Sequence, residues 1–337
     1  MNDRAVGVFE NYEIEVFRTW KGRGSLLCES DKGLLILKEY VGSKEKIDFQ
    51  DTLLTAVKKQ GFDMVETILR TKEGMLYATD KEENSYILKT YFDGRECNVR
   101  DEKECLQAVK TLASLHNASH VDYSIDCFNE TDIKNEFNID KEYEKHNKEL
   151  RKVRKFLKEK SQKNNFEIFL MKNYDYFFDF ALQIAEEVRY YLPNTSKTPD
   201  ERIICHGDYQ YHNILLTGEK MAIINFEKCM KDSPMRDLYL FMRKLLEKNN
   251  WEQELGDGVL SAYNSVRKMS EEDYRQLYYR FAYPEKFWKI VNFYFNSGKA
   301  WIPGRNLEKL EKLLEQEPDK IRYLENFKNN YRCFSFD

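Results

Sequence analysis

The fold of this chain is indicated most clearly by the segment Ile204-Cys-His-Gly-Asp-Tyr-Gln-Tyr-His-Asn-Ile-Leu-Leu216. Within it Asp208 and Asn213 lie five positions apart, between apolar residues that predict two short strands. In phosphoryl-transfer enzymes an Asp in such a loop takes or orients the proton of the attacking hydroxyl, and an Asn oxygen holds magnesium on the phosphates. The segment therefore predicts a catalytic loop, with Asp208 as the catalytic residue and Asn213 as a metal ligand.

A second strand, Met221-Ala-Ile-Ile-Asn-Phe-Glu227, should bring an aspartate to the same metal, but the position is Asn225. A carboxylate offers Mg²⁺ a full negative charge and two oxygens, whereas an amide offers one neutral oxygen. Metal assistance contributes several kcal/mol to such reactions, so Asn225 predicts weak or lost catalysis. Glu227, two positions further along the predicted strand, is an alternative ligand.

Lys38 ends a predicted strand, and a lysine there can neutralise the α- and β-phosphates of a nucleotide. The alternative is an ordinary surface lysine. The facing hairpin carries Gly22-Arg-Gly24-Ser25, in which Gly22 and Gly24 could let backbone amides approach the phosphates. We expect the acidic partner of Lys38 to come from the helix predicted over 44–59, and the sequence does not choose among its candidates, Glu45, Asp48 and Asp51.

The segment 88–94 joins the sheet-rich part to the helical part. If it crosses as a strand, the Thr90 carbonyl and the Phe92 amide can bind an adenine edge. A plain linker is equally compatible with the sequence.

The order of the segments predicts an α+β chain in two lobes. A small sheet lobe with one helix spans 1–92, and a large helical lobe spans 93–337 and contains the catalytic loop 204–227. The predicted strands of the first lobe are 12–17, 25–28, 34–38, 65–69, 75–78 and 86–92.

Composition excludes several classes of protein. The net charge of -4 and the pI near 5.9 do not indicate a nucleic-acid binder. No apolar run approaches membrane-spanning length, and the N-terminus lacks the apolar core of a signal peptide. Seven cysteines without a Cys-x-x-Cys pair indicate reduced thiols in a cytosol.

Three further features have plainer interpretations. His116 and His120 are four positions apart, but core packing is expected rather than a metal site. The basic run from Lys148 to Lys163 is expected to be a solvated helix face. The aromatic segment 278–288 is expected to be helix packing with a turn at Pro284.

The chain resembles the CotS-type spore coat kinase-like family, a branch of the aminoglycoside phosphotransferase and choline kinase superfamily. The resemblance runs through the segments Phe92–Glu96, Leu112–His116, His206–Asp208, Cys229–Asp237 and Tyr283–Trp288. It implies a two-lobed protein-kinase-like fold that binds ATP and Mg²⁺. Asp208 then takes the catalytic base position, Lys38 the phosphate position, and Asn213 and Asn225 the metal positions, while Asp237 braces the loop.

Family members come from endospore-forming bacteria. The resemblance implies synthesis in the mother-cell cytoplasm, assembly into the spore coat, other coat proteins as partners and a hydroxyl acceptor. Three functions remain open: a kinase-fold coat protein with slow or vestigial phosphotransfer, a purely structural coat scaffold, and a kinase for a sugar, choline-like or aminoglycoside alcohol.

Overall fold

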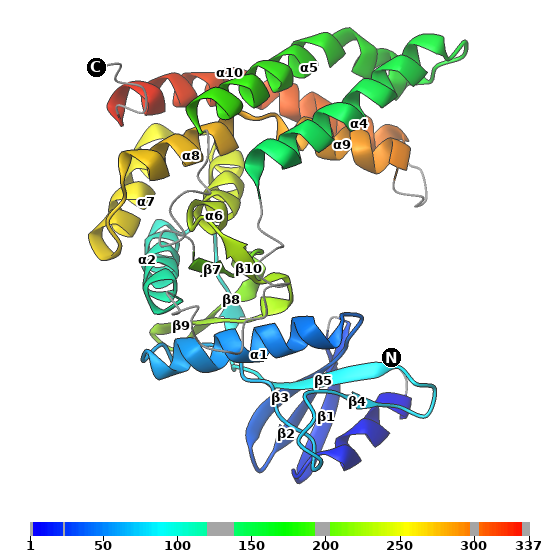
Figure 1. Cartoon of the computed structure of the whole chain (residues 1–337), viewed down its shortest axis with the longest axis vertical. Coiled ribbons are helices and arrows are strands. Elements are labelled where there is room, and N and C mark those ends of the chain that lie inside the picture. The colour runs from blue at the N-terminus through cyan, green and yellow to red at the C-terminus, as the bar shows by residue number, and fades with distance from the viewer. Residues whose placement is uncertain (1–2, 23, 120–137, 193–202, 297–302, 332–337) are drawn as a thin grey trace. The chain divides into compact units, whose positions relative to one another are not determined.

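The computed structural model describes residues 3–22, 24–119, 138–192, 203–296 and 303–331 (Figure 1). The chain divides into two compact units, each assembled from three segments. The first consists of residues 1–136, 202–241 and 261–267, and the second of residues 137–201, 242–260 and 268–337. The first unit therefore contains both the predicted sheet lobe and the predicted catalytic loop.

An antiparallel five-stranded sheet with the order β1-β2-β3-β5-β4 forms the N-terminal part of the first unit. Strands β2 and β3 form a hairpin in which Ser25 is directly opposite Lys38. Strand β5 lies on the other side of β3 and aligns Lys89 with Ile36. The strands are β1 (Val16–Gly22), β2 (Ser25–Ser30), β3 (Gly33–Glu39), β4 (Ala78–Thr79) and β5 (Ser85–Thr90).

The two faces of this sheet differ in chemistry, because alternate residues of a strand point to opposite sides. One face carries Leu35, Leu37 and Leu88, which pack in a core with residues of the 3-10 helix η1 (Asp3–Asn11). The register places Lys38 and Lys89 together on the opposite face. This lysine-bearing face takes part in the site described below.

Several strand predictions in this region were wrong at their ends. The predicted strand 12–17 begins only at Val16, some residues after the end of η1 at Asn11, and the predicted strand 75–78 shortens to Ala78–Thr79. The segment 65–69 makes only isolated bridges to neighbouring chain. Its ladder is interrupted because the amide of Thr67 binds the hydroxyl of Thr90 at 2.8 Å instead of a backbone carbonyl.

The helix predicted over 44–59 is confirmed as α1 (Lys44–Lys59), which begins where the Ser43 side chain accepts from the amide of Lys46. Its buried face includes Gln50. Helix α1 contacts α2 and the 3-10 turn η5. The remaining elements of this part are α2 (Glu102–Ala118), a three-stranded sheet of β6 (Arg95–Glu96), β8 (Ile214–Thr217) and β9 (Lys220–Ile223), and the pair β7 (Ile203–Cys205) and β10 (Met230–Asp232).

The second unit is helical. The basic run of α4 is largely solvent-exposed, as predicted. Tyr279, Phe281, Tyr283 and Phe287 are buried, so the aromatic segment is helix packing, also as predicted. The helices are α4 (Ile139–Glu159), α5 (Asn165–Tyr191), α8 (Glu271–Ala282), α9 (Glu285–Asn296) and α10 (Pro303–Asn330), while α6 (Met235–Lys248) and α7 (Gln253–Val266) contribute residues to both units.

The cysteines within the described ranges, at 28, 97, 105, 205 and 229, are buried free thiols. Among the helices of these ranges, none combines the length and apolar character needed to cross a membrane.

Candidate active site

The loop that carries Asp208 follows β7 and enters the 3-10 turn η4 (Tyr211–Asn213) before β8. Gly207 has a φ of +79°, and a Cβ at this position would meet the carbonyl oxygen of Lys228. Glycine is thus required twice over, for the left-handed backbone and for the close approach of two chain segments.

Asp237, in the first turn of α6, binds two consecutive amides of this loop. Its Oδ2 accepts from the His206 amide at 2.6 Å, and its Oδ1 accepts from the Gly207 amide at 2.8 Å. Burial raises the pKa of Asp237, but the hydrogen bonds from His116 and from the Gly207 amide outweigh burial and lower the pKa. The ionised carboxylate therefore braces the loop, which is the position that the family resemblance implies.

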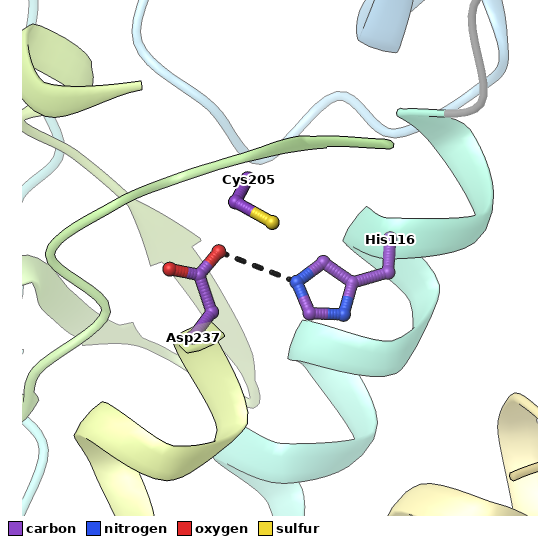
Figure 2. Close-up of side chains that lie close together, drawn as sticks. All are labelled: His116, Cys205 and Asp237. Carbon is purple, nitrogen blue, oxygen red and sulfur yellow. Dashed lines mark hydrogen bonds and ion pairs between the residues drawn. The ribbon is translucent and has the colours of Figure 1, made fainter. Parts of the chain in front are cut away.

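His116 and Cys205 lie beside Asp237 in the same buried cluster (Figure 2). His116 Nε2 is 3.3 Å from Asp237 Oδ2, and His116 Nδ1 is 2.7 Å from the Tyr263 hydroxyl. Cys205 Sγ lies 3.3 Å from the carbonyl oxygen of Ser233. The three side chains are close enough to hold a metal, but each already contacts a protein group. His116 thus packs in the core as predicted, whereas His120 lies outside the described residues.

His206 is a hydrogen-bonded brace of the catalytic loop. Its Nδ1 accepts from the amide of Asp208 at 3.1 Å, so the proton resides on Nε2, which donates to the carbonyl of Ile224 at 2.9 Å. The ring thereby links the catalytic loop to the chain that precedes Asn225.

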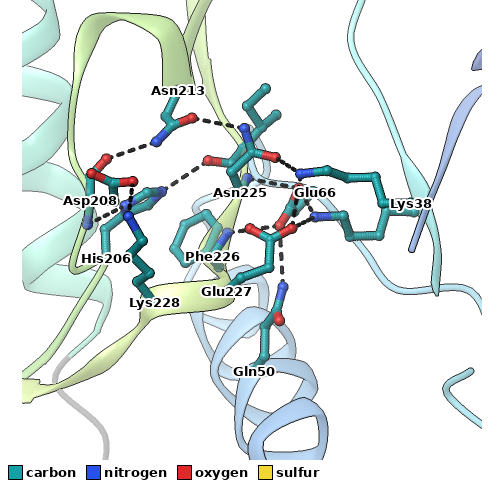
Figure 3. Close-up of polar contacts among 12 residues, drawn as sticks. Lys38, Gln50, Glu66, His206, Asp208, Asn213, Asn225, Phe226, Glu227 and Lys228 are labelled. Atoms are coloured by element: carbon teal, nitrogen blue, oxygen red, sulfur yellow. Dashed lines mark hydrogen bonds and ion pairs between the residues drawn. The ribbon is translucent and has the colours of Figure 1, made fainter. Parts of the chain in front are cut away.

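Asp208 is paired at both oxygens (Figure 3). Lys228 Nζ lies 2.8 Å from its Oδ2, and Gln210 Nε2 donates to its Oδ1 at 2.5 Å. Burial raises the pKa of Asp208, but the bonds from Lys228 and Gln210 and the nearby positive charge outweigh burial and lower the pKa. Asp208 is therefore an anionic acceptor whose two oxygens are occupied by Lys228 and Gln210.

Asn213 and Asn225, the two predicted metal ligands, are bonded directly to each other. Asn213 Nδ2 donates to the carbonyl of Asp208 at 2.8 Å, which leaves Asn213 Oδ1 facing Asn225. Asn225 Nδ2 donates to that oxygen at 2.8 Å. Asn225 Oδ1 then accepts from Lys38 Nζ at 2.7 Å.

Lys38 lies beside the catalytic loop and not on open surface. Besides Asn225, its Nζ contacts Glu227 Oε1 at 3.1 Å. The expectation of an acidic partner from helix 44–59 was wrong. Glu45 and Asp48 are exposed, and Asp51 pairs with Arg70.

A second lysine, Lys89, is fully buried next to Lys38. Its Nζ lies 2.8 Å from Glu66 Oε2 and 2.8 Å from Glu227 Oε1. Burial lowers the pKa of Lys89, but the two carboxylates outweigh burial and raise it. Burial raises the pKa of Glu227, but the charges of Lys89 and Lys38 outweigh burial and lower this pKa to about 2. Lys89 and Glu227 are therefore both charged, and each compensates the other.

Glu66 also fixes the backbone at position 225. Its carboxylate accepts from the amides of Asn225 at 2.9 Å and Phe226 at 3.0 Å, and Gln50 donates to it at 3.3 Å. Asn225 has a φ of +68° and begins the 3-10 turn η5 (Phe226–Lys228). The prediction that Glu227 continues the strand was wrong, because the left-handed turn directs it to the lysines.

The remaining residues that were predicted to bind nucleotide lie in two places. Gly24 has a φ of +67° at the turn between β1 and β2, and Ser25 is the cross-strand partner of Lys38. Thr90 ends β5, and Phe92 follows it and packs against Leu215, Ala222 and Ile224. The hairpin residues thus adjoin Lys38, while contact of Thr90 and Phe92 with adenine stays a prediction.

Sequence reasoning did not identify Lys89, Glu66, Gln50 or Lys228. One available signal was Lys89, a charge inside the apolar run Tyr86-Ile-Leu-Lys-Thr90. Because a buried charge requires a partner, such a lysine predicts a buried carboxylate nearby.

The donor set does not fit a resident Mg²⁺ between Asn213 and Asn225. The oxygen of Asn213 accepts an amide N–H, and the oxygen of Asn225 accepts from an ammonium group. Magnesium prefers carboxylate and water oxygens, and here each of the three nearby carboxylates, on Glu66, Asp208 and Glu227, is already paired with a lysine.

Comparison with known proteins identifies the family of this chain. The family model described as "spore coat putative kinase YutH" matches residues 6–327. Spore coat protein S of Bacillus subtilis (strain 168) is 22% identical over 330 residues, which cover 92% of this chain and 88% of that protein.

Two solved structures have the same fold. An aminoglycoside phosphotransferase from Alicyclobacillus acidocaldarius superposes with a TM-score of 0.83 at 17% identity, covering 98% of this chain and 96% of that one. A spectinomycin phosphotransferase solved with ADP and spectinomycin gives a TM-score of 0.66 at 16% identity, covering 96% and 97%. The predicted protein-kinase-like α+β fold is confirmed. The chain belongs to the YutH family of spore coat kinase-like proteins.

Proposed function

We propose that this protein is a spore coat component that binds ATP or ADP at the lysine-bearing face of its sheet, with phosphotransfer that is slow or lost. The observation that carries the proposal is the convergence of Lys38, Asp208, Asn213 and Asn225 in one network of hydrogen bonds. Lys38 supplies positive charge for phosphate, and Asp208 is the ionised acceptor for a hydroxyl.

Slow or lost transfer follows from the same residues. In a kinase site the second metal-binding position is an aspartate, and here it is an amide bonded to Asn213 and Lys38. Lys228 in addition occupies one oxygen of Asp208, where an incoming hydroxyl would bind. Each feature withdraws a group from the chemical step while leaving phosphate recognition by Lys38 available.

The place of action that we propose is the spore coat, after synthesis in the mother-cell cytoplasm and together with other coat proteins. The family membership and the similarity to spore coat protein S support this proposal. A purely structural coat role is the second candidate, and the Lys228–Asp208 ion pair favours it because it withholds the catalytic carboxylate.

The test is calorimetric titration of ADP and ATP into the purified protein, with Lys38→Met as the matched variant. We expect saturable binding by the native chain and a loss of about tenfold or more in the variant, the equivalent of about 1.4 kcal/mol. Absence of nucleotide binding by a folded native chain would favour the structural role. Turnover on a panel of small alcohols would instead indicate a small-molecule kinase.

A further inference from the structure

We infer that the protein binds its nucleotide without a divalent cation, because Lys38, held by Asn225, supplies the charge at the position where a kinase places its metal. This inference rests on the proposed nucleotide site. It concerns what neutralises the phosphates there.

The first line of argument is the direction of the hydrogen bonds. A backbone carbonyl can only accept a hydrogen bond, and an ammonium group can only donate one. The network therefore has a fixed acceptor at one end, the Asp208 carbonyl, and a fixed donor at the other, Lys38 Nζ. Between them the amides of Asn213 and Asn225 have one consistent orientation: each nitrogen points toward Asp208 and each oxygen toward Lys38. Every contact in this row joins a donor to an acceptor (Figure 3).

An aspartate at 225 would break this row. A carboxylate has no hydrogen to donate, so its oxygen would face the oxygen of Asn213, acceptor against acceptor. A cation between the two oxygens resolves that conflict, which is the arrangement that a metal-dependent kinase needs. With Asn225 the N–H bond to Asn213 takes the place of the cation.

The second line of argument is charge. The described cluster contains three lysines, at 38, 89 and 228, and three carboxylates, at 66, 208 and 227, which contact one another in pairs. The cluster is neutral as it stands. An aspartate at 225 would make it anionic by one charge and attract a cation, whereas the asparagine creates no such demand.

The third line of argument is rigidity. Glu66 binds the amides of Asn225 and Phe226, and this carboxylate is itself 1% exposed. The left-handed turn at Asn225 is thereby fixed, so the side-chain amide stays between Asn213 and Lys38. Turning the side-chain oxygen of Asn225 toward a metal would break its hydrogen bonds with Asn213 and Lys38.

The experiment is titration of ADP and of AMP-PNP into the full chain, once with EDTA and once with Mg²⁺. Three proteins are compared: the native chain, Asn225→Asp, and Asn329→Asp, which adds the same charge at an exposed site on α10. Thermal unfolding with Mg²⁺ alone is measured in parallel, since it reports metal binding without nucleotide.

For the native chain and Asn329→Asp we expect Kd values with EDTA within about threefold of those with Mg²⁺. For Asn225→Asp we expect binding with EDTA to be at least about tenfold weaker than with Mg²⁺, and Mg²⁺ alone to raise its Tm but not the native Tm.

If the native chain binds nucleotide only with Mg²⁺, the inference is overturned while the proposed nucleotide site stands. If it binds nucleotide under neither condition, the proposed function fails and this inference fails with it. Metal-independent binding by Asn225→Asp as well would show that position 225 does not set the metal requirement, and would also overturn the inference.

Discussion

Lys89 Nζ and Glu66 Oε2 lie 2.8 Å apart, and both side chains are almost completely shielded from water, with exposed fractions of 0% and 1%. Glu66 holds the turn at Asn225 with its other bonds, so this ion pair connects the interior of the sheet to the candidate site. Removing Glu66 leaves the buried Lys89 ammonium with one carboxylate, that of Glu227, in place of two.

Glu66→Ala is therefore expected to lower the free energy of unfolding by about 3–5 kcal/mol, measured by urea denaturation. The double variant with Lys89→Met should recover part of this loss, because it also removes the buried ammonium that has lost one of its two carboxylates. Lys148→Ala, which removes an exposed pair with Glu144, is the control and should change stability by less than about 1 kcal/mol. Equal losses in the single and double variants would show that the charge pair is not the cause.

Gly207→Ala should destabilise the protein and distort the catalytic loop, because the added methyl group meets the Lys228 carbonyl at a φ of +79°. Gly218→Ala provides the matched control, since its φ of +58° is also left-handed but nothing lies within 4 Å of the new methyl. The left-handed backbone alone costs about 1–2 kcal/mol, so Gly207→Ala should exceed Gly218→Ala by the contribution of the contact. Similar thermal shifts in both variants would contradict this account.

The contribution of Glu227 to stability should depend on pH. The pKa of Glu227 is lowered from 4.5 to about 2, because Lys89 and Lys38 overcome the effect of burial. A group with a depressed pKa in the folded state stabilises the protein above its unfolded pKa and loses this effect as pH falls toward the folded value.

The difference in unfolding free energy between the native chain and Glu227→Gln should accordingly be largest above pH about 4.5 and shrink toward pH about 2. Denaturant titrations at successive pH values measure it. A difference that stays constant through this range would mean that the carboxylate charge does not stabilise the fold.

Lys228→Met should raise the pKa of Asp208, because the Lys228 ammonium is a main cause of its lowered value. Carbon-13 chemical shifts of the Asp208 carboxyl group, followed through an acid titration, measure the change. Lys220→Met removes an exposed lysine from β9 and should leave the Asp208 pKa unchanged. A native-like titration curve for Lys228→Met would show that the contact does not persist in solution.

Short-range patterns predicted much of the fold. The hairpin around Gly33, the helix 44–59 and the two strands that enclose Asp208 and Asn213 follow from alternation, capping and turn residues close together in the sequence. The segment 65–69 did not follow, because its apolar residues resemble a strand while the Thr90 side chain takes the place of a ladder acceptor.

The charged part of the site was harder to predict, because its pairs join residues far apart in the chain. Lys38 and Glu227 are separated by 189 positions, and no local spacing relates them. Helix α1 contributes Gln50, which binds Glu66, and the partners of Lys38 come from the left-handed turn at Asn225. The left-handed turn at Asn225 was hard to predict, because positive φ is uncommon for residues other than glycine even though asparagine is enriched there.

Separation along the chain also means that the two sides of the site are synthesised at different times. Glu227 lies 138 positions after Lys89, so at about 5–20 residues per second a ribosome adds it about 7 to 28 seconds later. Throughout that interval every strand of the N-terminal sheet has already been translated, but Lys38 and Lys89 still lack the carboxylate that they share. Until translation passes the turn at Asn225, Lys89 has Glu66 as its carboxylate partner, while the groups that hold Lys38 in the folded protein, Asn225 and Glu227, are still to be made.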